Sequence, residues 1–196
     1  MQSIKVNIGV CGRFHFHNYV SYLAEKGVLN RFYFSQKIGA PKNLGKAASV
    51  SKNLWIKEYL MRGIGPFLQD HYAEQFLSFC HEIWQNLVLQ NWDSAPIFHL
   101  LLHGTGLRII KKTKSENGIV LVEIVNAHPL ELAKLLEEED EKRLSLPKKN
   151  HLWAAEKKRI EEIYESDFLL VPSNWVLSSL IKYGIDKKKI FKFLME

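Results

Sequence analysis

The chain has 196 residues, of which 46% are hydrophobic, 12% aromatic and 24% charged. This is the composition of a folded domain of ordinary size, and it excludes disordered, collagen-like and coiled-coil proteins. Two cysteines, Cys11 and Cys80, are too few for a disulfide framework. No apolar run approaches the ~20 residues that span a bilayer, and the first residues lack the pattern of a signal peptide. We therefore expect a cytoplasmic protein.

The net charge of +6 is concentrated in the first part of the chain. Lys and Arg outnumber Asp and Glu by 14 to 7 in residues 1–120, against 13 to 14 in residues 121–196. Six cations between Lys37 and Arg62 accompany a single acidic residue, Glu58. Such a segment suits phosphate groups on a ligand or an anionic membrane surface, and a solvated basic face is an equal alternative. No nucleic-acid-binding module accompanies the charge, so we expect no nucleic-acid partner.

Short apolar runs alternate along the chain with longer runs at helical spacing. In chain order, the first half of the pattern predicts a strand over residues 4–10, a helix over 16–26, a strand over 31–34, and helices over 47–62 and from 66 to 92. The second half predicts strands over 97–101 and 119–125, helices over 129–140 and 151–165, a strand over 168–171 and the start of another at 190–194. Strands without polar alternation are typical of parallel sheets covered on both faces. The sequence therefore predicts an α/β fold: a Rossmann-like three-layer domain with a mostly parallel sheet and a helical insertion at about 45–92.

In open α/β sheets, ligands bind beyond the carboxyl ends of the strands. The first turn there holds Gly12, which lets a ligand approach the backbone, and Arg13, which can bind a phosphate or carboxylate. Neither the dinucleotide fingerprint nor the phosphate-binding loop is present, which disfavours those two classes of enzyme. Another turn places Gly104 and Gly106 ahead of a helix, where they form either a nest for an anion or sugar hydroxyl, or merely a tight turn.

Two further turns follow the later predicted strands. His128 stands just before Pro129, which can begin a helix, so we expect the imidazole in the strand-end cleft, where it can act as a general base. A helix cap or a core position is its alternative role. Ser173 follows the strand over 168–171, and most simply caps the next helix. The other histidines lack a completing set of cysteines or carboxylates, so we expect no metal.

A specific pattern lies near the end of the chain. It resembles the E-x-x-x-A-D-x-(apolar)₃-P-S-x-x-V…G-(V/I)…K-I pattern of family 4 glycosyltransferases. The turn from Gly12 to His15 is similar to the first loop of that family, and the segment from Glu123 through His128 to Glu139 is similar to the segment after its fourth strand. The positions of the late pattern in this chain are Glu162, Ser166 (in place of Ala), Asp167, Pro172, Ser173, Val176, Gly184, Lys189 and Ile190.

This resemblance implies a GT-B enzyme, in which two Rossmann-like domains face each other across a cleft. The first domain binds the acceptor, and the second binds a nucleotide-sugar donor. The chain matches only the first, so we expect residues 1–196 to form one domain from which the donor-binding domain is absent. The implied reaction transfers a sugar to a glycan or lipid-linked acceptor with no metal or other cofactor. Peripheral contact with the anionic inner face of the membrane is an open alternative to a purely cytoplasmic location.

The resemblance also implies roles for individual residues. His128 is expected to be catalytic and to hydrogen-bond the reacting sugar, whereas Glu123 is expected to be structural. A non-catalytic binding or regulatory module with the same fold is the alternative function, and an unrelated nucleotide-dependent oxidoreductase is disfavoured. The expected substrate-binding residues are Gly12, Arg13, His15, Gly104, Thr105 and Ser173.

Overall fold

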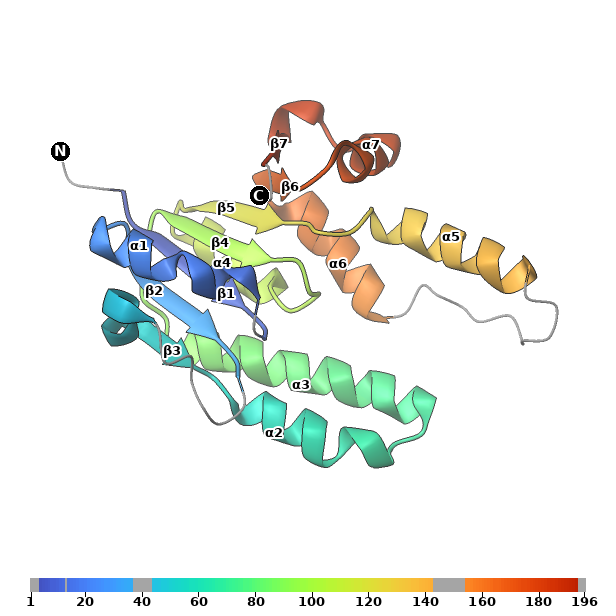
Figure 1. The fold of residues 1–196 in the computed structure, drawn as a ribbon, viewed down its shortest axis with the longest axis horizontal. Coiled ribbons are helices and arrows are strands. Elements are labelled where there is room, and N and C mark those ends of the chain that lie inside the picture. Colours follow the sequence, from blue (N-terminus) through green and yellow to red (C-terminus); the bar gives the residue numbers. More distant parts are fainter. Residues whose placement is uncertain (1–3, 13, 37–43, 143–153, 194–196) are drawn as a thin grey trace.

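The computed structural model describes residues 4–12, 14–36, 44–142 and 154–193. Within them, seven strands form one sheet in the order β3-β2-β1-β4-β5-β6-β7, and every neighbouring pair is parallel (Figure 1). The expected Rossmann-like α/β fold is therefore confirmed. The strands are β1 (Val6–Val10), β2 (Leu29–Phe34), β3 (Ser51–Asn53), β4 (Ile97–Leu101), β5 (Ile119–Glu123), β6 (Phe168–Val171) and β7 (Ile190–Lys192).

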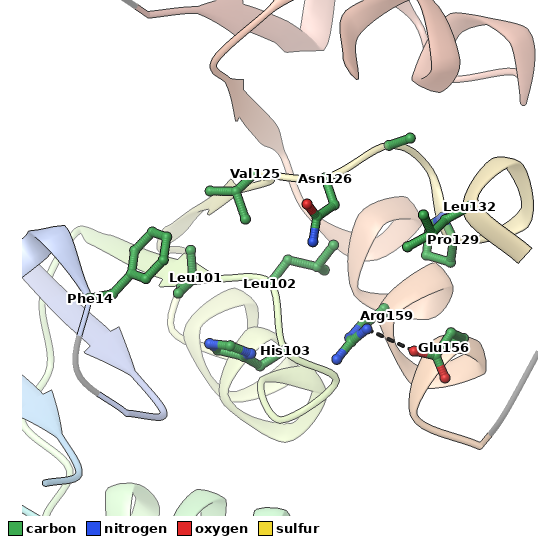
Figure 2. A pocket seen from close by; sticks show the side chains of 11 residues that line it. Phe14, Leu101, Leu102, His103, Val125, Asn126, Pro129, Leu132, Glu156 and Arg159 are labelled. Carbon is green, nitrogen blue, oxygen red and sulfur yellow. Dashed lines mark hydrogen bonds and ion pairs between the residues drawn. The ribbon is translucent and has the colours of Figure 1, made fainter. Parts of the chain in front are cut away.

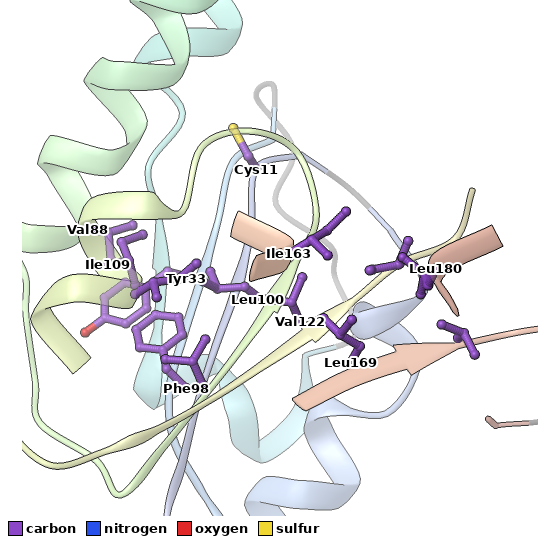
Figure 3. Close-up of a cluster of buried hydrophobic side chains, with 14 of the residues drawn as sticks. Cys11, Tyr33, Val88, Phe98, Leu100, Ile109, Val122, Ile163, Leu169 and Leu180 are labelled. Carbon is purple, nitrogen blue, oxygen red and sulfur yellow. The ribbon is translucent and has the colours of Figure 1, made fainter. Parts of the chain in front are cut away.

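Helices cover both faces of this sheet. One core cluster joins the strands to α3 (Asp70–Gln90), α4 (Leu107–Ser115), α6 (Ala154–Glu165) and α7 (Asn174–Lys182) (Figure 3). The other joins them to the 3-10 helix η1 (His15–Asn18), α1 (Val20–Glu25) and the 3-10 helix η2 (Gly45–Val50). Tyr33 belongs to the first cluster and its neighbours Phe32 and Phe34 to the second. Since successive side chains of a strand point to opposite faces, the two clusters lie on opposite sides of the sheet.

One strand lies inside a segment that the sequence predicts to be helical. Residues 47–62 were expected to form one helix, but η2 is followed by β3 and only then by α2 (Ile56–Gly63). β3 pairs with β2 at the sheet edge, with Ser51 opposite Phe32 and Asn53 opposite Phe34. A three-residue polar strand carries no hydrophobic pattern of its own, so pairing with its neighbour determines its conformation.

Two pairs of helices flank the carboxyl ends of the strands. α2 and α3, joined by the 3-10 helix η3 (Gly65–Phe67), pack against each other and extend past one side of this sheet edge (Figure 1). α5 (Pro129–Lys142) and α6 extend past the other side. The short 3-10 helix η4 (Lys187–Lys189) precedes β7 at the far edge of the sheet. The turns that follow β1, β4 and β5 therefore open between the two pairs.

Candidate functional site

A cavity of about 130 Å³ lies at the carboxyl ends of β4 and β5. Its walls also include the turn after β1, the first turn of α5 and the first two turns of α6 (Figure 2). An apolar cavity of roughly 150 Å³ holds a benzene-sized ring, so this one is close to the size of a six-membered ring. Its apolar wall consists of Phe14, Leu101, Leu102, Val125, Ala127, Pro129 and Leu132, and its polar groups are His103, Asn126, Glu156 and Arg159.

An ion pair on α6 contributes unused hydrogen-bonding atoms to this cavity. Arg159 Nη1 donates to Glu156 Oε1 over 2.7 Å (Figure 2). Arg159 Nε and Glu156 Oε2 are buried and have no hydrogen-bond partner among the described residues. Because an unmatched buried polar atom costs free energy, these two atoms are suited to a polar ligand.

His103 is the one imidazole among the residues that line the cavity. Burial, together with smaller contributions from the positive charges of Arg159 and Lys57, lowers the pKa of His103 to about 4. The ring is therefore neutral near pH 7, so that one nitrogen donates a hydrogen bond and the other accepts one.

A buried carboxylate lies between two other imidazoles at the end of β5. His15 Nε2 hydrogen-bonds Glu123 Oε2 over 3.2 Å and lies 3.0 Å from Oε1. His99 Nε2 is 3.5 Å from Glu123 Oε2 and makes no hydrogen bond among the described residues. The side chain of Glu123 is 2% exposed and that of His15 is 29% exposed. His15 directly follows Phe14, a residue of the cavity wall, and the two rings are 4.6 Å apart. The pair of His15 and Glu123 therefore adjoins the cavity.

The predicted glycine nest exists, but the chain's own Glu162 occupies it. The Glu162 carboxylate is buried and accepts hydrogen bonds from Gly104 N, over 2.9 Å, and from Gly106 N. Burial raises the pKa of Glu162 to about 7, although these bonds, and one from the His103 backbone, act in the opposite direction. Thr105, between the two glycines, is buried as well. The nest therefore fixes a loop that borders the cavity.

The His128 ring is not where the sequence places it. We expected it in the strand-end cleft, but it is completely buried, and its neighbours Ala127 and Pro129 line the cavity instead. His128 Nδ1 accepts a hydrogen bond from Leu130 N over 3.2 Å at the start of α5, and the ring stacks on Tyr183 at 4.5 Å. Burial lowers the pKa of His128 to about 4. This environment favours the alternative role, a helix cap in the core, and the catalytic role remains a prediction.

The other predicted residues are dispersed along the sheet edge. Gly12 has φ +145°, a backbone conformation that favours glycine, and the space beside it is open. Arg13 lies outside the described residues. Ser173 follows β6 and caps α7, since its hydroxyl accepts a hydrogen bond from Val176 N over 3.3 Å. Of the predicted substrate-binding residues, His15 and the loop of Gly104 and Thr105 come near the cavity.

Sequence reasoning missed several residues of this site. His103 and Asn126 stand in turns that the sequence singled out, and their place after a strand was the available signal. Glu156 and Arg159 gave no signal, because charged residues on a helix are typical of a solvent-facing side. Glu123 was taken as structural, since a lone carboxylate at a strand end does not reveal the imidazoles around it.

The described residues contain no group of three His, Cys, Asp or Glu side chains arranged to hold a metal ion. No helix among them is both long and apolar enough to cross a membrane.

No protein-family model matches the chain, and no curated protein matches it in sequence. Solved structures do match it. The N-terminal domain of trehalose-6-phosphate phosphatase from Candida albicans is 11% identical with a TM-score of 0.54, and the match covers 100% of this chain and 49% of that one. A protein provisionally named UDP-N-acetylglucosamine 2-epimerase from Listeria monocytogenes is 13% identical with a TM-score of 0.52, over 97% of this chain and 45% of that one.

The chain spans just under half the length of these structures. At such low sequence identity the likeness is one of fold. The chain is therefore a Rossmann-like α/β domain with an all-parallel sheet over its described residues, and its cavity lies at the carboxyl edge of that sheet.

Proposed function

We propose that this chain is the acceptor-side domain of a glycosyltransferase, which transfers a sugar from a nucleotide sugar to a glycan or lipid-linked acceptor. The observation that carries the proposal is the ring-sized cavity with apolar and polar lining residues, at the carboxyl edge of the sheet beside His15 and Glu123. The names of the two matched structures, which refer to UDP-N-acetylglucosamine and trehalose-6-phosphate, support a sugar-related enzyme.

The chemistry of a sugar ring matches that of the cavity wall. A pyranose has apolar C–H faces and hydroxyl groups around its rim, so it needs an apolar surface together with a few well-placed polar groups. Phe14 and Val125 offer the apolar surface, and the amide of Asn126 and the guanidinium of Arg159 offer hydrogen bonds. On the resemblance to family 4, transfer proceeds without a metal, and Gly12 and Arg13 approach the donor.

Binding of a lipid-linked acceptor is the second part of the proposal, and it assigns α2 and η3 to a membrane surface. Trp55 is 48% exposed, Tyr59 37% and Phe67, at the turn into α3, 85%. Aromatic side chains are favoured at the interface of a bilayer, and nearby cations add attraction to anionic lipids. Lys57 does not contribute, because it is buried and pairs with Glu58 over 2.5 Å. Of the basic segment, Lys46, Lys52 and Arg62 are exposed, and Lys37 and Lys42 lie outside the described residues.

The membrane contact is tested by sedimentation of the chain with phosphatidylglycerol and phosphatidylcholine vesicles. We expect binding to the anionic vesicles that weakens with salt, at about 1 kcal/mol per cation near the surface. Trp55→Ala should weaken it, whereas Tyr22→Ala, which removes a more exposed ring from α1, should not. Equal binding to both kinds of vesicle would contradict the electrostatic attraction.

Sugar transfer is tested with the enzyme that contains this chain, using UDP-glucose and UDP-N-acetylglucosamine as donors and a panel of simple glycosides as acceptors. Arg159→Ala should raise the acceptor KM about tenfold or more, because a hydrogen bond to a charged group contributes about 1.5–3 kcal/mol. The matched control is Arg108→Ala, which removes an exposed guanidinium on α4 away from the cavity. Equal effects of the two substitutions would count against the cavity as the acceptor site.

A non-catalytic binding module is the second candidate function. It is favoured by the environments of His128 and of the glycine nest, because groups expected to meet a substrate are occupied within the protein. Saturable binding of a glycoside that depends on Arg159, without transfer from any sugar nucleotide, would support this candidate.

A further inference from the structure

The charges in the lining of the cavity are balanced. Glu156 and Arg159 are the charged residues among the described residues that line it, and they pair with each other over 2.7 Å. The ring of His103 is neutral near pH 7, since its pKa is lowered chiefly by burial, and the remaining polar group is an uncharged amide. Lys158, the neighbouring cation on α6, pairs with Glu82 over 2.6 Å. Over the described residues, the cavity therefore offers a ligand no uncompensated charge.

The ion pair nevertheless leaves one donor and one acceptor without a partner. Arg159 Nε is a buried donor and Glu156 Oε2 is a buried acceptor, and neither makes a hydrogen bond among the described residues. A hydroxyl group can meet either atom, because its oxygen accepts a hydrogen bond and its hydrogen donates one. A carboxylate only accepts and an ammonium only donates, so each of these groups can meet one of the two atoms. Neighbouring hydroxyl groups of one sugar ring can meet both.

The charge of Glu156 acts against an anionic ring. In a cavity of about 130 Å³, a carboxylate or phosphate on the ring comes close to Glu156 whichever way the ring is turned. Two negative charges would then share the single positive charge of Arg159. The side chains of Glu156 and Arg159 are only 16% and 30% exposed, and like charges repel more strongly there than in water. A neutral ring meets the same ion pair without this repulsion.

We propose that the cavity selects a neutral sugar ring of the acceptor and that Glu156 is the residue that excludes an anionic ring such as a uronic acid, an inference that rests on the proposed function. Arg159 Nε donates a hydrogen bond to one hydroxyl oxygen of the ring, and a neighbouring hydroxyl donates to Glu156 Oε2. Specificity of this kind comes from an unfavourable contact with the wrong ligand as much as from a favourable one with the right ligand. Glu156 thus determines which acceptor binds and takes no part in the transfer step.

Two pairs of matched glycosides test this selection by charge. Methyl glucoside and methyl glucuronide share a ring and differ in the carboxylate at one carbon, as do methyl galactoside and methyl galacturonide. In a ligand-observed NMR titration of the enzyme that contains this chain, the wild type should bind the neutral member of a pair at least about tenfold more tightly, which corresponds to about 1.4 kcal/mol of repulsion. This comparison needs no variant, so it tests the inference even if a substitution disturbs the fold.

Glu156→Gln should reverse the order of the two affinities. The new amide keeps an oxygen acceptor for the neutral ring, so the affinity for that ring should fall by only a few-fold. The charge of Arg159 is then free to pair with a ligand carboxylate, and the affinity for the uronic acid should rise about tenfold or more. The matched control, Glu161→Gln, removes an exposed carboxylate from the same helix and should leave both affinities unchanged.

The possible results distinguish this inference from the proposed function. Equal or tighter binding of the uronic acids by the wild type overturns the selection by charge, although the cavity remains an acceptor site. Equal selectivity of Glu156→Gln and Glu161→Gln overturns the role of Glu156. If no member of either pair binds to the wild type, the proposed function loses its acceptor site, and the inference fails with it.

Discussion

Two glutamates at the same edge of the sheet are both buried, but one contacts backbone N–H groups and the other contacts histidine side chains. Glu162 on α6 accepts hydrogen bonds from the backbone N–H groups of Gly104 and Gly106. Glu123 at the end of β5 faces the side chains of His15 and His99. The first site is closed, because the amides are fixed by the main chain. The second is open on one side, because the imidazole of His15 is partly exposed.

This difference indicates that one carboxylate has a structural role at this edge of the sheet and that the other can take part in chemistry. Backbone amides neither titrate nor move far, so a carboxylate bound to them can only hold a loop in place. An imidazole can exchange a proton, so a carboxylate bound to it can support chemistry. The same contrast separates two histidines: His128 is buried and caps a helix, while His15 lies partly in solvent. Substitutions in the closed region should therefore affect stability, and those in the open region should affect activity.

The largest effect on stability is expected from Glu162→Ala. Removal of the carboxylate leaves the buried N–H groups of Gly104 and Gly106 without an acceptor, at about 1–3 kcal/mol each. We expect the free energy of unfolding to fall by roughly 3 kcal/mol or more, measured by urea denaturation. The matched control is Glu161→Ala, which removes the exposed neighbouring carboxylate on the same helix and should change stability by less than about 0.5 kcal/mol. Similar losses in the two variants would show that Glu162 does not hold the loop.

A pH effect of intermediate size is expected from His128. Its pKa is lowered to about 4 by burial, so the unfolded chain binds a proton below about pH 6.5 that the folded chain does not bind. The stability of the wild type should therefore fall as the pH is lowered from about 6.5 to about 4, by at most about 3 kcal/mol from this residue. His128→Asn, which keeps a capping acceptor but cannot take up the charge, should make this part of the curve less steep, while His103, whose pKa is also lowered to about 4, keeps its own contribution.

The same variant tests the catalytic prediction. If His128 caps a helix, activity per folded molecule should be retained in His128→Asn. A kcat lowered by ~10²–10⁴-fold with an unchanged pH dependence of unfolding would instead support a catalytic imidazole, and would break the contrast with His15.

The sequence predicts the elements of the sheet well because their signal is local. The predicted strands at 97–101 and 168–171 have the same bounds as β4 and β6, since each is a short run of mainly apolar residues, interrupted in β4 only by His99. β3 was missed because its residues, Ser51, Lys52 and Asn53, are polar and are held by pairing with β2. The apolar pattern of the sequence therefore predicts the buried strands, whereas the polar edge strand β3 can be recognised only from its pairing with β2 in the structure.

The sequence predicted the region of the site, but not which side chains contact one another there. Strand-end turns were the correct regions, because a parallel sheet collects them at one edge. What the sequence cannot display is which side chains meet across that edge: 58 residues separate Glu162 from Gly104, and 108 separate His15 from Glu123. A glycine pair is the same in sequence whether its amides bind a ligand or a glutamate. The role of each residue at this edge is thus determined by its contacts in three dimensions.

The smallest effect, and a direct test of the closed region, is expected from Gly104→Ala. Gly104 has φ +75°, which an L side chain rarely adopts, and an added Cβ would lie 2.8 Å from the backbone oxygen of Ala155 at the start of α6. We expect a loss of about 1–3 kcal/mol in the free energy of unfolding, because a strained conformation and a backbone clash both act against the folded state. Gly63→Ala is the matched control: no atom lies within 4 Å of its added Cβ, so it should be neutral or slightly stabilising. If Gly104→Ala instead leaves stability intact and lowers acceptor affinity, the loop yields to a ligand, and the closed region belongs to the binding site.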